Sequence, residues 1–317
     1  MTPRTVSPIA GRRRRTTVTR TPSPFRYPGG KGRMTDFAQE TLRLNGARGG
    51  TWVEPFAGGG GLALSLLGRG AVGRVVLNDT DDGVRSFWEA VLNEPDRVAR
   101  DVATVPLTVA EWDRWRAVRE RGGTGYEAGF AAFYLNRTNR GGVIDGAGVI
   151  GGRAQRGAYG MACRFPRAAL VQKVRAIAAV RDRVEVRGED GVAVIVRAAE
   201  DDPRGTFLFV DPPYWHKGPN LYGPPFGPHD HARLASALKA VRGPWIATYD
   251  RCEPVSALYR DRRVYEMEGA LPPGSVPRDA EVVVVSKGMA VPDRLRQRRL
   301  PVPGQLAMRF DPSPVPA

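Results

Sequence analysis

The residues best suited to chemistry follow an apolar run, in the segment TFLFVDPPYW at 206–215. Asp211 and the carbonyl of Pro212 are two hydrogen-bond acceptors, and an exocyclic amino group has two donors to give them. The rings of Pro212 and Pro213 fix φ and remove two backbone donors, so the turn is stiff. Tyr214 adds a flat face on which a base extruded from a duplex would stack. The segment indicates a site for an aromatic amine, and a purely structural proline turn is the alternative.

Two further acids end apolar runs in the same way. Asp79 ends RVVLND, where an acid suits bidentate hydrogen bonding to ribose hydroxyls. Asp190 follows RVEVR and could accept a hydrogen bond from an adenine amino group. Each would serve equally well as the N-cap of a following helix, and the sequence leaves both readings open.

A glycine-rich loop, VEPFAGGGG, ends the first of these runs. Glycines from Gly58 onward let the backbone turn tightly and approach a ligand, and the following helix offers free N–H groups. Glu54, Pro55 and Phe56 make the motif more selective than glycines alone. It is not a P-loop, because no Gly-Lys-Ser/Thr follows.

The segment FRYPGGKGRM at 25–34 places an aromatic ring, two glycines and an ammonium together. Lys31 is suited to meet a ligand carboxylate. Tyr27 is suited to pack near a cationic sulfonium. A surface turn is the alternative.

These motifs must be positioned by strands and helices that alternate along the chain. We expect seven strands, at 51–56, 74–79, 183–187, 206–210, 245–250, 263–268 and 281–287. Helical patterns between most of them, such as 167–179, 192–199 and 231–241, predict right-handed crossovers and a mostly parallel α/β sheet. The last two strands have no helix between them, so an antiparallel pair is expected there. Ligands of such sheets bind at the carboxyl ends of the strands, where the motifs fall.

Composition and rhythm divide the chain into parts. Residues 24–83 and 181–290 form the predicted catalytic domain. The stretch 84–180 is too long for a loop and is predicted to be an inserted domain. Residues 1–23 are arginine-rich without an acid and indicate a disordered basic arm. Residues 291–317 form a tail rich in proline and arginine.

The insertion carries polar side chains that could contact nucleic acid. Its segment FYLNRTNRGG contains residues of the types that read purine edges or grip phosphates: Asn136, Arg137, Asn139 and Arg140. A solvated loop is the alternative. The net charge of 48 − 33 = +15 favours a polyanionic partner.

Other features bound the class of protein. No uncharged apolar run approaches the ~18 residues of a membrane span, and no secretory signal is visible. Two cysteines without CxxC spacing indicate a reducing, cytoplasmic setting without a structural zinc site. His216, His229 and His231 lack the spacing of a metal site, so no metal is expected.

The ordered set FRYPGGKGRM, VEPFAGGGGLAL, VLNDTD and FVDPPYW resembles the D12-class, Dam-type N6-adenine-specific DNA methyltransferases, over roughly residues 24–290. The resemblance implies a seven-stranded, Rossmann-like S-adenosylmethionine-dependent methyltransferase sheet with an inserted target-recognition domain. It implies a cofactor site with Asp79 on the ribose and Asp190 on the adenine. Its other cofactor-binding residues would be Tyr27, Lys31, Glu54, Pro55, Phe56, Gly58 and Asp211. The implied catalytic pocket consists of Asp211, Pro212, Pro213 and Tyr214.

The expected activity is methyl transfer from S-adenosylmethionine to N6 of a flipped adenine in double-stranded DNA, by a bacterial or phage-encoded protein. A cognate restriction endonuclease is a candidate partner. The alternatives are an amino-group methyltransferase acting on cytosine N4, RNA or a protein glutamine, and a non-catalytic DNA-binding module on the same fold. The intact DPPY motif argues against the last of these.

Overall fold

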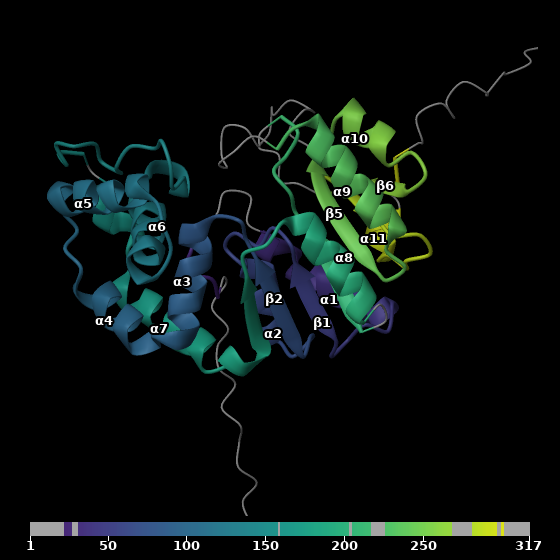
Figure 1. Cartoon of the computed structure of the whole chain (residues 1–317), viewed down its shortest axis with the longest axis horizontal. Coiled ribbons are helices and arrows are strands. Elements are labelled where there is room, and N and C mark those ends of the chain that lie inside the picture. The colour runs from purple at the N-terminus through teal and green to yellow at the C-terminus, as the bar shows by residue number, and fades with distance from the viewer. Residues whose placement is uncertain are drawn as a thin grey trace, which may run out of the picture.

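A seven-stranded sheet forms the centre of the protein, in the order β3-β2-β1-β4-β5-β7-β6 (Figure 1). The computed structural model describes residues 22–26, 31–157, 159–202, 205–216, 226–267, 281–296 and 299–300. The strands are β1 Thr51–Glu54, β2 Arg74–Asn78, β3 Val184–Arg187, β4 Thr206–Val210, β5 Trp245–Asp250, β6 Arg263–Glu266 and β7 Glu281–Val285. All seven predicted strands are present, three of them two residues shorter than expected at their C-terminal ends.

Strand direction follows the expectation from the sequence. The pairs β3–β2, β2–β1, β1–β4 and β4–β5 are parallel. β7 lies between β5 and β6 and is antiparallel to both. The predicted mostly parallel α/β sheet, with antiparallel pairing of the last two strands, is therefore confirmed.

The apolar character of β4 reflects burial on both faces of the sheet. All five of its residues are buried. On one face Phe207 and Phe209 stack on Trp52 of β1, with ring centroids 5.0 and 5.5 Å apart. On the other face Leu208 and Val210 join a separate core cluster. A strand covered on both sides reads as a continuous apolar run, as this one does.

Helices cover both faces of the sheet. They are α1 Thr35–Leu44, α2 Gly61–Gly68, α8 Gly191–Asp201, α9 Pro228–Ala240, α10 Glu253–Leu258 and α11 Asp293–Arg296, with the short 3₁₀ turns η1 Lys31–Met34 and η4 Arg181–Arg183. Residues of α8, α9 and α10 pack in the same cluster as Leu208, and Figure 1 shows α8 and α9 in front of the sheet. Residues of α1 and α2 pack in the cluster that contains Trp52.

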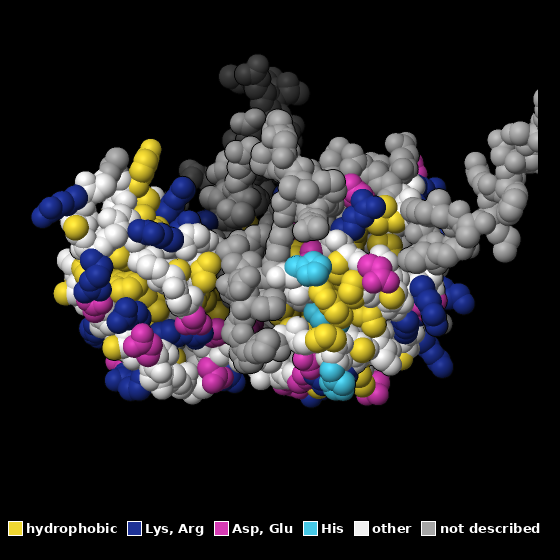
Figure 2. All heavy atoms as spheres, turned by 90° about the horizontal axis from the view of Figure 1, so that it is seen from above, with side chains coloured by type: hydrophobic (Ala, Val, Ile, Leu, Met, Phe, Trp, Pro, Cys, Tyr) yellow, Lys and Arg dark blue, Asp and Glu magenta, His cyan; other side chains and the backbone are white. Residues whose placement is uncertain are grey.

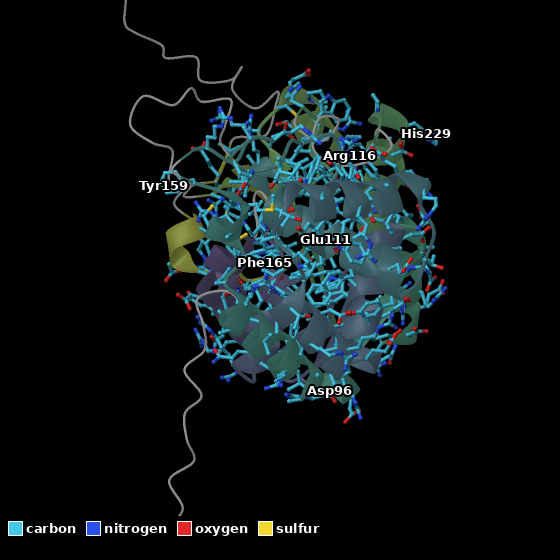
Figure 3. All side chains as sticks on the ribbon, turned by 90° about the vertical axis from the view of Figure 1, so that its left-hand side faces the viewer. Asp96, Glu111, Arg116, Tyr159, Phe165 and His229 are labelled. Atoms are coloured by element: carbon cyan, nitrogen blue, oxygen red, sulfur yellow. The ribbon has the colours of Figure 1, made fainter. Side chains whose placement is uncertain are left out.

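The stretch predicted as an insertion forms a helical lobe beside β3 (Figure 1). Its elements are α3 Asp82–Asn93, α4 Pro95–Thr104, α5 Val109–Arg121, α6 Tyr126–Thr138, η2 Arg140–Gly142, η3 Met161–Arg164 and α7 Arg167–Ala178. Figure 3 views the lobe from its outer side, with Glu111 and Arg116 of α5 facing the viewer and the highly exposed Tyr159 at the rim.

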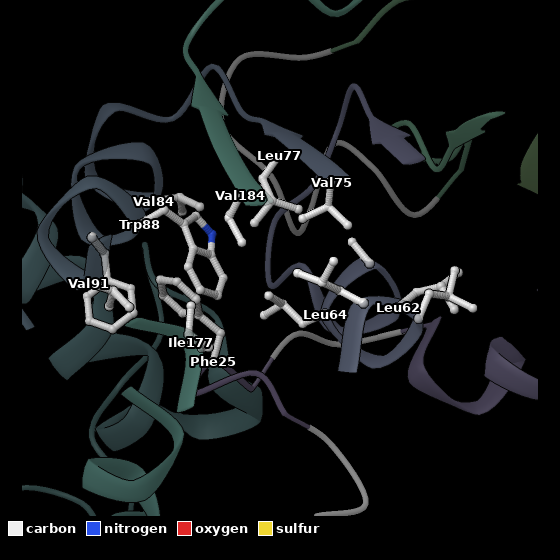
Figure 4. Close-up of a cluster of buried hydrophobic side chains, with 14 of the residues drawn as sticks. Phe25, Leu62, Leu64, Val75, Leu77, Val84, Trp88, Val91, Ile177 and Val184 are labelled. Atoms are coloured by element: carbon white, nitrogen blue, oxygen red, sulfur yellow. The ribbon is translucent and has the colours of Figure 1, made fainter. Parts of the chain in front are cut away.

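The lobe and the sheet share one hydrophobic core. Phe25, Phe87 and Phe133 pack together, and the ring centroids of Phe25 and Phe87 are 4.8 Å apart. The same cluster continues through Trp88 to Leu77 of β2 (Figure 4). The lobe is therefore anchored to the sheet by buried apolar surface as well as by the chain connection.

No helix in the described part of the chain is long and apolar enough to cross a membrane.

Candidate active site

A cavity of about 1240 Å³ opens at the carboxyl ends of the parallel strands. It is lined by the loops that follow β1, β2, β3 and β4, including Gly58, Asp79, Asp190 and Asp211. The lobe contributes Arg119, Arg137, Asp145 and Lys173 to the same cavity. The strand-end motifs of the sequence therefore converge on one site, as the rule for open α/β sheets requires.

Asp79 holds the glycine loop in place. Its Oδ2 accepts a hydrogen bond of 2.8 Å from the Gly58 N–H, and its Oδ1 accepts one of 2.9 Å from the Asp81 N–H. Gly58 and Gly60 have φ of +47° and +55°, which favours glycine. The N-cap of α3 is Asp81, which accepts hydrogen bonds from Gly83 and Val84, so the capping alternative for Asp79 is wrong. Burial raises the pKa of Asp79 to about 6.

Asn78 ties three strand-end loops together, a role that sequence reasoning missed. Its side-chain amide donates hydrogen bonds of 2.9 Å to the carbonyls of Pro55 and Glu189, and its Oδ1 accepts one from the Glu189 N–H. Asn78 is fully buried. Pro55 is also buried and does not line the cavity, so its carbonyl serves the packing of the loops. The feature of the sequence that could have indicated this role is a polar residue, Asn78, at the end of an otherwise apolar strand.

Glu54 is a buried carboxyl group at the end of β1. Its Oε1 accepts hydrogen bonds of 2.9 Å from Trp52 Nε1 and from the Ala63 N–H. Burial, with a smaller contribution from Asp211, raises its pKa to about 7, although these hydrogen bonds and Lys31 act in the other direction. A cationic group bound in the cavity would favour the ionised form of Glu54.

The predicted adenine side of the site is built around Phe56. Its ring meets Phe226 edge to face, with centroids 5.8 Å apart. A Cβ added at Gly191 would lie 2.6 Å from the Phe56 ring, so only glycine permits this close approach. Asp190 caps α8 through the N–H groups of residues 192 and 193, which confirms the capping reading. Both its oxygens also accept hydrogen bonds from the Arg233 guanidinium, at 3.1 and 2.7 Å, and this pairing lowers the pKa of Asp190.

The DPPY segment brings Asp211 into contact with Lys31 and Thr248, and Tyr214 and Glu281 complete the cluster. Lys31 Nζ lies 3.0 Å from Asp211 Oδ2 and donates a hydrogen bond of 2.8 Å to the Tyr214 hydroxyl. Thr248, on β5, donates from its hydroxyl to Asp211 Oδ1. The Tyr214 hydroxyl in turn donates to Glu281 Oε1 at 3.1 Å. Thr248 and Glu281 were missed because only the sheet topology brings β5 and β7 to the end of β4.

The backbone after Tyr214 is fixed by Asp250 at the end of β5. Asp250 accepts hydrogen bonds of 2.9 Å from the N–H groups of Trp215 and His216. The Trp215 ring stacks on His231, with centroids 4.8 Å apart, and does not line the cavity. His231 is buried, and burial lowers its pKa. The described residues contain no group of three or more His, Cys, Asp or Glu placed to hold a metal ion.

Two of the four residues predicted to contact DNA from the insertion, Asn136 and Asn139, are turned inward. Asn136 and Asn139 are almost fully buried. Asn136 exchanges hydrogen bonds with the backbone of Arg26, and Asn139 donates to the carbonyls of Val143 and Ile144. Their amide groups fold the loop after α6 and do not face a ligand. Of the two arginines predicted to contact DNA, Arg140 is exposed, and its role stays a prediction.

Arg137 is buried but lines the cavity together with Arg26 and Lys173. Burial and the neighbouring cations Arg26 and Arg164 lower the pKa of Arg137 to about 10. Burial and Arg137 likewise lower the pKa of Lys173. Within the described chain none of the three lining cations has an acidic partner within ion-pair distance. The site therefore has a basic wall of Arg26, Arg137 and Lys173 on the side of the lobe.

Arg119 of α5 fastens the lobe to the loop after β2. Its guanidinium donates to both oxygens of Asp81, at 2.7 and 2.6 Å, and to both oxygens of Asp145, at 2.8 and 2.6 Å. Burial acts to raise the pKa of Asp81, but Arg119 outweighs it and holds that pKa below the ordinary value. One side chain thus links the cap of α3 to the loop that follows α6.

Tyr27 lies outside the described residues, as do most of the basic arm and the C-terminal tail. The other predicted cofactor and catalytic residues that line the cavity are Lys31, Glu54, Phe56, Gly58, Asp79, Asp190, Asp211, Pro212, Pro213 and Tyr214.

The protein therefore has a Rossmann-like α/β sheet in which β7 is inserted antiparallel, and carboxylates follow the ends of β1, β2, β3 and β4. Residues 27–113 match the family model of the D12 class N6 adenine-specific DNA methyltransferases. Over this segment the match confirms the resemblance predicted from the sequence. The matched segment contains Lys31, Glu54 and Asp79 of the cavity.

Solved structures of methyltransferases are also similar to this chain. The rRNA methyltransferase aviRa from Streptomyces viridochromogenes has 15% sequence identity and a TM-score of 0.37, over 82% of this chain and 86% of that chain. TrmN from Thermus thermophilus has 14% identity and a TM-score of 0.31, over 78% of this chain and 47% of that chain. No curated protein matches the chain by sequence.

The family and the fold imply S-adenosylmethionine as the cofactor, and the residues present fit it. The buried carboxyl groups of Glu54 and Asp79 suit a ligand with a cationic amino-acid end and ribose hydroxyls. The glycine loop lets the backbone approach, and the edge-to-face pair of Phe56 and Phe226 offers apolar surface to a purine.

Proposed function

We propose that this protein is an S-adenosylmethionine-dependent methyltransferase that modifies N6 of a flipped adenine in double-stranded DNA. One observation carries the proposal. Lys31, Glu54 and Asp79, from the segment that matches the DNA methyltransferase family, line the same cavity as the DPPY segment more than 100 residues later. When bound, S-adenosylmethionine would supply a methyl group carried on a sulfonium. The methyl group is transferred, and the electron pair of the broken C–S bond stays on sulfur.

The chain contributes acceptors for the target amine. We assign Asp211 and the Pro212 carbonyl as the acceptors of its two N–H groups, because these hydrogen bonds would favour a more tetrahedral nitrogen and offset its growing positive charge. Thr248 fixes the orientation of the Asp211 carboxylate through Oδ1. The target nitrogen gains one bond to carbon and loses one proton. The proton can leave after the methyl group has been transferred. Asp211 is assigned as a hydrogen-bond acceptor and not as a full general base.

Tyr214 is proposed to stack on the flipped base. Its hydroxyl is held by Lys31 and Glu281, which fixes the ring at the cavity. Burial, Asp211 and Glu281 raise the pKa of Tyr214, so the phenol stays protonated. Stacking returns part of the few kcal/mol that base flipping costs.

The basic wall supports a polyanionic substrate. Arg26, Arg137 and Lys173 line the cavity, and a phosphate would supply the negative charge that they lack within the described chain. Figure 2 shows further basic side chains scattered over the lobe.

The test is a tritium-transfer assay with unmethylated DNA, followed by digestion and base analysis. N6-methyladenine is the expected product, and methylation-sensitive sequencing of DNA from expressing cells would locate the site. N4-methylcytosine, or transfer to RNA or to a protein glutamine instead, would contradict the proposed substrate.

Asp211→Ala is the matched variant. It should keep cofactor binding in a titration and lose methyl transfer by a factor of at least ~10², because the acceptor acts only on the reacting amine. Turnover by Asp211→Ala at the wild-type rate would remove Asp211 from the mechanism.

A further inference from the structure

Lys31 occupies the acceptor that the proposed reaction needs. Its ammonium lies 3.0 Å from Asp211 Oδ2 and 2.8 Å from the Tyr214 hydroxyl. It also lies 3.5 Å from Glu281 Oε1. Only 6% of the Lys31 side chain is exposed, so the ammonium is held inside this ring of partners.

This arrangement conflicts with binding of the target amine. Thr248 already donates to Asp211 Oδ1, and Lys31 is on Oδ2. An amine that accepts a methyl group becomes more positive, and a cation on the same carboxylate opposes that change. Each carboxylate oxygen can still accept a further hydrogen bond, but the ammonium weakens Asp211 as an acceptor, so Asp211 serves the amine best once the ammonium has moved away.

Glu281 is the other carboxylate within reach. It is the first residue of β7, and 14% of its side chain is exposed. Its Oε2 is held by Arg33 at 2.5 Å, which leaves Oε1 to Lys31 and to the Tyr214 hydroxyl. Burial acts to raise the pKa of Glu281, but Lys31 and Arg33 outweigh it, so the group stays ionised.

We propose that Glu281 is a positioning residue that takes over the Lys31 ammonium when the target amine binds, and so releases Asp211 to that amine. The inference rests on the proposed function. The shift is short, because Lys31 Nζ is already 3.5 Å from Glu281 Oε1 and the Tyr214 hydroxyl contacts both groups. The lysine chain is flexible enough to change partners by rotation near its end.

A purely structural role for Glu281 would make a different prediction. In that case the carboxylate only balances Lys31 and Arg33, and its removal would lower stability without any preference for the substrate amine. The experiment must therefore measure an effect that depends on that amine.

The experiment measures binding of two duplexes that carry the sequence located by methylation-sensitive sequencing. One duplex has adenine at the target position and the other has purine, which lacks the amino group. Both are titrated in the presence of sinefungin, an unreactive analogue of the cofactor. Purine pairs more weakly and is easier to flip, so the adenine-to-purine affinity ratio of each variant is compared with that of wild type. Glu281→Gln should lower this ratio by about fivefold or more, as expected when hydrogen bonds to a charged acceptor are weakened.

Three variants complete the design. Glu281→Asp keeps the charge and should restore part of the preference. In the background of Lys31→Met, Glu281→Gln should have no further effect on the adenine-to-purine ratio, because Glu281 acts through Lys31. Glu266→Gln is the matched control, since Glu266 is a glutamate on the neighbouring strand β6 that pairs with Arg251 away from the cavity.

The outcomes distinguish failure of the proposed role of Glu281 from failure of the proposed methyltransferase function. Single-turnover methyl transfer by Glu281→Gln should fall together with the amine preference, while the melting temperature reports folding. If Glu281→Gln folds and keeps the full preference for adenine, or loses it equally in the Lys31→Met background, the inference is overturned and the proposed function stands. If the wild-type protein transfers no methyl group to DNA, both fail.

Discussion

Glu54 illustrates how one residue couples the site to stability. Its carboxyl group is enclosed at the end of β1, and both hydrogen bonds that it makes within the described chain engage Oε1. Such a group is more easily protonated in the folded state than in the unfolded chain. Ionisation of Glu54 in the folded protein therefore lowers stability, and the ionised carboxylate can then bind a cationic ligand.

The pH dependence of stability tests this view. Between pH 4.5 and about 7 the folded state holds a proton on Glu54 that the unfolded chain has lost. The free energy of unfolding should therefore fall as pH rises through this window, by on the order of 3 kcal/mol from Glu54 alone. Glu54→Gln retains an acceptor for Trp52 and Ala63 but cannot ionise, so it should flatten the fall. Urea unfolding at several pH values measures it.

An exposed carboxylate supplies the control. Glu120 is largely exposed and pairs with Arg116 at the surface, so Glu120→Gln should leave the slope unchanged. A Glu54→Gln variant with the same slope as wild type would show that Glu54 is ionised in the folded protein throughout this range.

Single residues also show where sequence reasoning ends. Asp211 and Tyr214 could be assigned from their own segment, because a carboxylate and a ring after a strand are local features. Asn136 and Asn139 could not, because a polar residue in or just after a helix gives no sign in its own segment that it is buried. One partner of Asn136 is the backbone of Arg26, 110 residues away. Thr248 and Glu281 reach the site only through the order of the strands.

At the scale of elements, the strands were predictable because each is a short apolar run with a polar end. Within the lobe, α7 was predicted at 167–179 and is found at Arg167–Ala178. Helix α6 was not predicted, because it is buried along nearly its whole length and lacks a polar face. The insertion was recognised only by its length. Its attachment to the sheet depends on aromatic residues from three separate segments, such as Phe25, Phe87 and Phe133.

Arg119 is the polar counterpart of this attachment. Arg119→Ala would leave the carboxylates of Asp81 and Asp145 facing each other without a cation. We expect it to lower the free energy of unfolding by about 2–3 kcal/mol, as for a partly buried pair that loses one partner. It should also weaken cofactor binding, because Asp81 and Asp79 share one loop. Chemical denaturation and a cofactor titration measure the two effects.

A second arginine of the same helix provides the comparison. Arg121 lies 3.8 Å from Glu127, and both side chains are mostly exposed, so Arg121→Ala should cost less than about 1 kcal/mol. Equal losses of unfolding free energy for Arg119→Ala and Arg121→Ala would mean that the link between α5 and the loop after β2 stabilises the fold no more than an exposed ion pair does.

At the scale of the whole molecule, charge is distributed unevenly around the cavity. The chain carries a net charge of +15, yet the loops after β1 and β2 present Glu54, Asp79 and Asp81 to the cavity. The basic wall lies on the side of the lobe. This separation suits a cationic cofactor on the sheet and a phosphate backbone against the lobe.

Lys173 tests the assignment of the basic wall. It lies on α7, lines the cavity and donates a hydrogen bond of 2.9 Å to the Ser23 carbonyl. If its ammonium contacts a phosphate, Lys173→Ala should weaken DNA binding about equally for all sequences. It should also reduce the slope of log K against log salt concentration by about 0.9. Fluorescence anisotropy over a range of salt concentrations measures both.

Arg175, on the same helix but exposed and not lining the cavity, is the control of equal charge. Arg175→Ala removes the same positive charge and so changes long-range attraction to a similar degree. A phosphate contact at Lys173 requires that only Lys173→Ala changes the salt slope by a full unit of charge. If the two variants behave alike, the basic wall acts through its overall field, and the phosphate must be held elsewhere in the lobe.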